Sequence, residues 1–155
     1  MDMQLSGRVI AEADIRPAVR YDGLMLPLPL REHPYLIHTN RELGLMLKGI
    51  KPLAMFADGE DYFPEAVLRY LRMFDRHVES GRFVRRDVIE VPSGIRIRHI
   101  YFALSDEAWR IQAMIDLKSR PGRWTRAKER EQGELLGYTS EQNDLWLSRY
   151  CKWPD

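Results

Sequence analysis

Cysteine is almost absent from this chain of 155 residues, where Cys151 is the single example. One thiol cannot form an intrachain disulfide, and a zinc site built from cysteines needs several of them. We therefore expect a free thiol, folding without a resident metal, and a reducing compartment, which predicts a cytoplasmic location.

Long hydrophobic runs are absent as well. No apolar stretch approaches the ~18 residues of a membrane helix, and the first eight residues lack the basic start and apolar core of a signal peptide. No repeat or linker divides the sequence. These absences predict a soluble protein with no membrane partner, folded as a single domain over residues 1–155 that buries roughly two-thirds of its unfolded surface.

The common cofactor signatures are missing too: the sequence holds no glycine-rich phosphate loop, nucleotide fingerprint or serine elbow. We expect no cofactor. The acidic turn at residues 58–61 could hold Mg²⁺ or Ca²⁺ through carboxylate oxygens. Ordinary turn chemistry explains the same residues, and their spacing does not match the twelve-residue calcium loop.

What the chain does have is a clear β-hairpin at about residues 83–104. Residues 84–91 and 95–102 are rich in β-branched and aromatic side chains, which suit a half-buried pleated surface. Between them lie Pro92, Ser93 and Gly94, with glycine where a three-residue hairpin loop needs a left-handed residue.

Helical patterns surround this hairpin, and together they predict an α+β fold. Residues 7–30 look extended, residues 52–57 read as a buried strand, and capping boxes at Thr39 and Thr139 open two helices. Further helices are expected after Pro64, Ser105 and Thr125. The expected architecture is a mostly antiparallel sheet covered by helices on one face, with a helical C-terminal third.

The register of the hairpin decides which side chains meet. If the residues that flank the loop, Val91 and Ile95, pair with each other, then Asp87 lies opposite His99. A carboxylate bonded to one imidazole nitrogen fixes the tautomer and leaves the other nitrogen as a general base. Asp87 and His99 are therefore candidate catalytic residues, although the same pair is also an ordinary structural ion pair.

The same register places Arg85 opposite Tyr101, on the face that carries His99. An arginine beside an acid–base pair can hold an anionic substrate. This constellation predicts a small cofactor-independent enzyme as one function of the chain. A partly buried polar patch at the rim of the sheet is the alternative interpretation.

Charge is distributed unevenly although the net charge is only +1. Residues 1–81 hold 10 Lys or Arg against 12 Asp or Glu, residues 82–130 hold 12 against 6, and residues 131–155 hold 2 against 5. A basic middle segment favours an acidic or phosphate-bearing partner. Neutralisation by the acidic segments in the folded protein is the alternative.

The basic residues gather around Trp124, with Arg123 and Arg126 on either side of it. Tryptophan and arginine are enriched at binding hot spots, so these three residues predict a surface for a protein partner or an anionic ligand. Single-stranded nucleic acid is a weaker possibility because no nucleic-acid-binding motif accompanies them. The favoured function is thus a small cytoplasmic partner-binding protein, for instance a regulatory, accessory or immunity-type factor. The sequence specifies neither its partner nor its oligomeric state.

Overall fold

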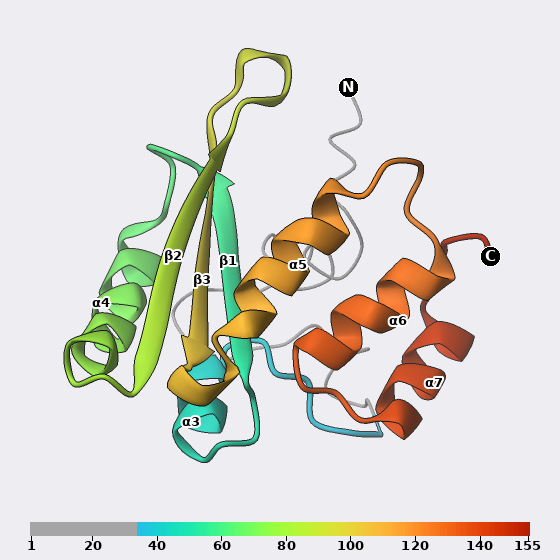
Figure 1. Ribbon diagram of the computed structural model, residues 1–155, viewed down its shortest axis with the longest axis horizontal. Coiled ribbons are helices and arrows are strands. Elements are labelled where there is room, and N and C mark those ends of the chain that lie inside the picture. The colour runs from blue at the N-terminus through green and yellow to red at the C-terminus, as the bar shows by residue number, and fades with distance from the viewer. Residues whose placement is uncertain (1–33) are drawn as a thin grey trace.

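A three-stranded antiparallel sheet forms the centre of the protein in the computed structural model, which describes residues 34–155. The strands are arranged in the order β1-β3-β2 (Figure 1), with the bounds β1 (Leu53–Gly59), β2 (Phe83–Glu90) and β3 (Ile97–Leu104). The predicted α+β fold and the hairpin at residues 83–104 are confirmed. The extended segment predicted at residues 7–30 lies outside the described residues.

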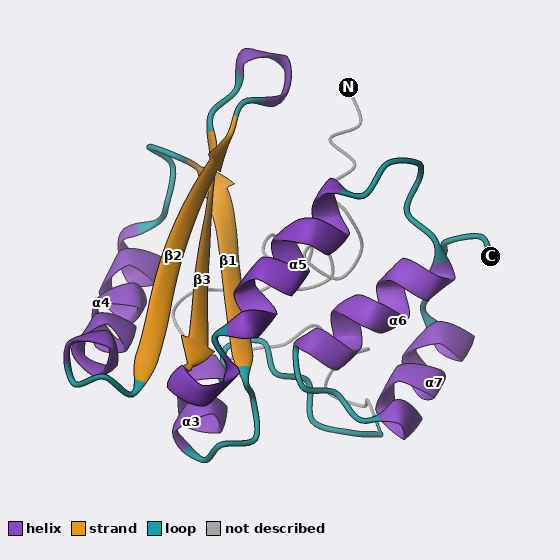
Figure 2. Cartoon of the chain, viewed as in Figure 1, coloured by secondary structure: helices purple, strands orange, loops and turns teal. Residues whose placement is uncertain are grey.

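Helices cover both faces of this sheet, so the prediction of cover on one face is wrong. Figure 2 shows them in purple: α3 (Glu42–Leu47), α4 (Glu65–Glu79), α5 (Trp109–Ser119), α6 (Arg126–Leu135) and α7 (Ser140–Arg149). The apolar side chains of α4 pack on one face, and those of α5 pack on the other. Helices α6 and α7 follow α5 and complete the helical C-terminal third (Figure 1). Among the described helices, none is long and apolar enough to cross a membrane.

The α4 face is built as its sequence pattern predicts. Val67, Leu71 and Phe74 recur at helical spacing and are buried. The ring of Phe74 lies 4.7 Å from that of Phe102 on β3, the central strand. Gly81 follows the helix with φ +78°, as the predicted left-handed end requires.

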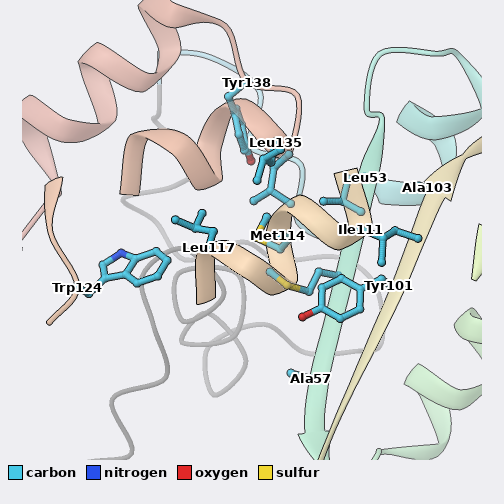
Figure 3. Packing of buried hydrophobic residues seen from close by; sticks show 12 residues of the cluster. Leu53, Ala57, Tyr101, Ala103, Ile111, Met114, Leu117, Trp124, Leu135 and Tyr138 are labelled. Atoms are coloured by element: carbon cyan, nitrogen blue, oxygen red, sulfur yellow. The ribbon is translucent and has the colours of Figure 1, made fainter. Parts of the chain in front are cut away.

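The α5 face holds a larger apolar cluster that joins the sheet to the C-terminal helices. Figure 3 shows side chains from β1, β3, α5 and α6 meeting there, among them Leu53, Tyr101, Met114, Leu117 and Leu135. This cluster fixes α5 over β1 and β3, and thereby positions the polar residues at the end of that helix.

The caps of the helices differ in how well the sequence foretold them. The capping box at Thr139 is confirmed, because its hydroxyl accepts from the Gln142 amide and the Gln142 side chain accepts from the Thr139 amide. The capping box at Thr39 is wrong. Glu42 instead accepts from the amide of Asn40, which has a left-handed φ of +65°. The helix α3 therefore begins after Arg41, two residues later than a cap at Thr39 would place it.

Candidate functional site

The hairpin pairs one residue out of the predicted register. Glu90 lies opposite Ile97, and a short 3₁₀ turn, η1 (Pro92–Gly94), closes a loop that runs from residue 91 to residue 96. Both Ser93 (φ +52°) and Gly94 (φ +80°) are left-handed. Because residues 91 to 96 all lie outside the strands, the loop is longer than the three-residue type that the sequence suggested.

This shift exchanges the faces of β2, because successive side chains along a strand point to opposite sides. Asp87 lies opposite Ile100 on the α4 face, whereas His99 lies opposite Val88 on the α5 face. The predicted pairing of Asp87 with His99 is therefore wrong.

The predicted grouping of Arg85 with Tyr101 fails for the same reason. Arg85 lies opposite Phe102, and Tyr101 lies opposite Arg86. Arg86 is thus the arginine that shares a face with His99 and Tyr101.

On the α4 face, Asp87 and Arg85 belong to a chain of ion pairs. Arg85 donates to Asp87 (Nε–Oδ1 2.8 Å) and to Asp75 on α4 (Nη1–Oδ1 2.8 Å). Arg98 donates to Asp87 (3.0 Å) and to Glu60 (2.9 Å). The hydrogen bond from Arg85 holds the pKa of Asp87 below its ordinary range. Because each charge is matched, this network fastens the hairpin to α4 and the β1 turn.

Replacing Asp87 tests that structural role. We expect Asp87→Asn to lower the free energy of unfolding by about 1–2 kcal/mol, since charge-assisted bonds from two arginines are weakened. The difference from the native chain should shrink as the pH falls below 4, because a carboxyl group with a lowered pKa stabilises only while ionised. Urea unfolding measures both effects, and exposed Asp106→Asn is the control. A pH-independent difference would contradict the assignment.

On the α5 face, three elements bring three titratable groups into a row. His99 of β3 is 2% exposed. Its Nδ1 lies 3.2 Å from Nζ of Lys118 at the end of α5, and its Nε2 lies 3.2 Å from Oε2 of Glu90 at the end of β2. Nζ of Lys118 also lies 3.7 Å from the sulfur of Met55 on β1. The row Lys118–His99–Glu90, which we call the lysine–histidine centre, is the candidate site.

The imidazole of this centre is neutral. Burial, followed by the positive charge of Lys118, lowers the pKa of His99 to about 4, although Glu90 acts in the opposite direction. An ammonium group has no acceptor, so Nδ1 accepts from Lys118 and Nε2 carries the proton. That proton faces Glu90 at ion-pair distance but without the angle of a good hydrogen bond.

The lysine of this centre is poised to lose its proton near neutral pH. Burial lowers the pKa of Lys118 to about 8, and the charge of Glu90 partly opposes this. A lysine with a pKa in this range is partly an uncharged amine at pH 7–8, where it serves as a base or nucleophile.

The residues around this centre differ in their exposure to solvent. Tyr101 is buried, its ring is stacked near that of His99, and burial raises its pKa, so its hydroxyl stays protonated. Glu90 is 53% exposed, Arg86 is exposed and donates to Gln112 (2.6 Å), and Lys118 is partly exposed. Glu90 and Arg86 therefore face solvent at this centre and Lys118 does so in part, while His99 and Tyr101 are buried.

The predicted tryptophan surface is wrong, because Trp124 is only 8% exposed. Its ring points toward Leu117 in the α5 cluster (Figure 3). Its indole Nε1 donates to Oε2 of buried Glu129 (2.9 Å), and Trp146 donates to the other carboxylate oxygen (2.8 Å). The buried carboxylate therefore holds two indoles between α6 and α7.

The positive charges around Trp124 are largely matched. Arg120 pairs with Glu131, Arg126 with Asp155 and Arg130 with Asp144. Nζ of Lys128 donates to four backbone carbonyls in succession, those of Arg120, Pro121, Gly122 and Arg123. Of the predicted binding residues in this segment, Arg123 is the one that is exposed. Neutralisation by the acidic C-terminal segment, the alternative interpretation, describes this region better.

The acidic turn after β1 is occupied by other contacts. Glu60 binds Arg96 and Arg98, and Asp58 accepts from the amide of Gly59 (2.8 Å). Within residues 34–155, no group of three or more His, Cys, Asp or Glu side chains is placed to hold a metal ion.

Sequence reasoning missed Lys118 and Glu90 because it looked for a carboxylate directly across the hairpin. One signal was present: Lys118 continues the buried stripe of α5 through Ile111 and Met114, at i+4 from Met114. A lysine at an apolar position of a helix predicts a buried amine.

Comparison with known proteins adds nothing to this geometry: the chain matches no protein-family model, and no curated protein or solved structure matches it significantly.

Proposed function

We propose that the chain is a small cofactor-independent enzyme that transfers a proton to and from an anionic substrate at the lysine–histidine centre. The observation that carries the proposal is the position of His99, buried and held between Lys118 and Glu90 at 3.2 Å on either side. Clusters of titratable groups with shifted pKa values are concentrated at functional sites.

Lys118 is the general base of this proposal. Its amine loses a proton to solvent near pH 8, takes a proton from the substrate and later returns it. His99 is a positioning residue, since its Nδ1 directs the amine of Lys118 and its burial keeps it from the substrate. Met55 on the other side of Nζ keeps that amine poorly solvated.

Arg86 and Glu90 complete the site. Arg86, opposite Tyr101 on the same face, supplies the guanidinium that binds an anionic group. This is the role that the sequence assigned to Arg85. Glu90 is accessible, and its negative charge 3.2 Å from Nε2 favours the tautomer of His99 that carries the proton on that nitrogen.

The test is hydrogen exchange at carbon. We incubate the native chain in D₂O at pH 8 with a panel of small α-keto acids and phosphorylated carbonyl compounds. At least one of them should exchange a proton on the carbon next to its ketone or aldehyde carbonyl. Because a positioned general base contributes about 10²–10⁴-fold, Lys118→Met should slow that exchange at least about 100-fold. The control Lys48→Met alters an exposed lysine and should leave it unchanged. No exchange by the native chain, or equal rates for the two variants, would refute the proposal.

A partner-binding function, the one that the sequence favoured, is the second candidate. Trp124 does not support this function, because it is buried. The support comes instead from the hairpin, whose loop projects beyond the end of β1 (Figure 2). Val91 is 52% exposed and Ile95 is exposed beside it, and apolar side chains at a projecting tip favour contact with another protein. A cytoplasmic location stays a prediction.

A further inference from the structure

We infer that two copies of this chain associate through β2, with the β2 strands of the two copies pairing antiparallel about a two-fold axis at Val88. Within the described residues, the inference rests on the edge and one face of this strand. It does not require the proposed enzymatic function, although Arg86 and Glu90 belong to both.

The outer edge of β2 is open within the part of the chain that the structure describes. β2 pairs with β3 along one side, and no described strand pairs with its other side. Such an edge presents backbone donors and acceptors to any strand that approaches it. Helix α4 packs on one face of β2.

The α5 face of the same strand is only partly covered, because α5 reaches it through Gln112, which accepts from Arg86. Helix α5 lies over β1 and β3, so the β2 side chains on that face reach solvent: Val84, Arg86 and Glu90 are exposed, and Val88 is partly buried. This row, with one apolar residue between an arginine and a glutamate, is the surface that a second copy would extend.

Charge favours one register of the pairing. A two-fold axis perpendicular to the sheet keeps each face on its own side, so one residue of β2 lies on the axis. Centred on Val88, the pairing sets Arg86 opposite Glu90 of the partner subunit, and the reverse, with the two Val88 side chains between them. Centred on Arg86 or on Asp87, it would set like charges directly opposite each other, which is unfavourable.

The pairing brings a second residue to each lysine–histidine centre. Glu90 lies 3.2 Å from His99, and in this register Arg86 of the partner subunit reaches Glu90 from the other side. The two centres of the dimer would then share one continuous six-stranded sheet.

Position-specific disulfide formation tests the register. In a Cys151→Ser background, Val88→Cys should give a cross-linked dimer under mild oxidation, because directly opposed residues in a strand pair have Cβ atoms about 4.5–5.5 Å apart, within a small adjustment of the separation that a disulfide spans. Val84→Cys is the matched control on the same row of the same strand. It would lie opposite residue 92, roughly 26 Å from its own copy at about 3.3 Å per residue, and should not cross-link.

Sedimentation of the uncross-linked full chain gives the second arm. We expect a species of twice the 18.3 kDa chain mass, with Arg86→Glu raising the dimer dissociation constant at least about ten-fold, or 1.4 kcal/mol. Arg123→Glu, on another surface, should leave that constant unchanged. A native chain that remains monomeric, or equal cross-linking at positions 84 and 88, would overturn the inference. A native chain that dimerises but shows no proton exchange would refute the enzymatic proposal alone.

Discussion

Glu129→Ala should lower the free energy of unfolding by about 3 kcal/mol, more than any other change of a carboxylate in the C-terminal helices. The carboxylate of Glu129 accepts from the indoles of Trp124 and Trp146. Without it, Trp124 keeps a buried N–H that has lost its acceptor, and a buried donor left in this way costs about 1–3 kcal/mol. Trp146 loses a charge-assisted bond as well.

Urea unfolding followed by tryptophan fluorescence measures this effect. Glu129→Gln retains one acceptor oxygen and should lose about half as much stability, while Glu134→Ala, an exposed change on the same helix, should stay within about 0.5 kcal/mol of the native chain. If Glu129→Ala were as mild as Glu134→Ala, the buried carboxylate would not be what holds α6 to α7.

The other large effect is a loss of stability in acid that depends on His99. Its pKa falls from 6.5 to about 4 on folding, so the unfolded chain binds this proton more readily than the folded one. The stabilisation from a neutral His99 is complete above pH 6.5 and is lost as the pH falls toward 4. A shift of this size corresponds to about 3 kcal/mol.

Unfolding curves for the native chain and His99→Gln at pH 7, 6, 5 and 4 separate this contribution from that of the carboxylates. The difference between the two proteins should narrow steadily between pH 6.5 and 4. A native chain equally stable at pH 7 and pH 4.5 would contradict the assignment of a buried, neutral His99.

The sequence predicted the elements better than their contacts. The periodicity of α4 and the β-rich runs of the hairpin are local properties, and both were read correctly. The register of the hairpin depends on the conformation of Ser93, which takes a left-handed φ of +52°. A serine at this position does not predict a left-handed conformation. The resulting shift of one residue in the register brings Arg86 and Glu90, instead of Arg85 and Asp87, to the face that carries His99.

Burial of Trp124 was likewise beyond local reasoning. Arg123 precedes it and Arg126 follows two positions later, which suggests exposure to solvent. Its neighbours in space are Leu117 in the α5 cluster and the carboxylate of Glu129. The carboxylate that accepts from the buried indole belongs to the next helix, α6. The sequence of α6 contains several glutamates, and its pattern does not reveal which of them is buried.

The ammonium group of Lys128 sits among four successive carbonyls as a cation sits in a crown ether. The connection from α5 to α6 therefore folds around a positive charge that belongs to α6. Its backbone carbonyls bind this charge, and its own side chains take no part in the binding. Arg120 and Arg123 contribute only their backbone oxygens here. The exposed positions 120, 121 and 123 should therefore tolerate wide variation in their side chains as long as position 128 remains a lysine, whereas neutralising that one amine would leave four carbonyl dipoles facing one another.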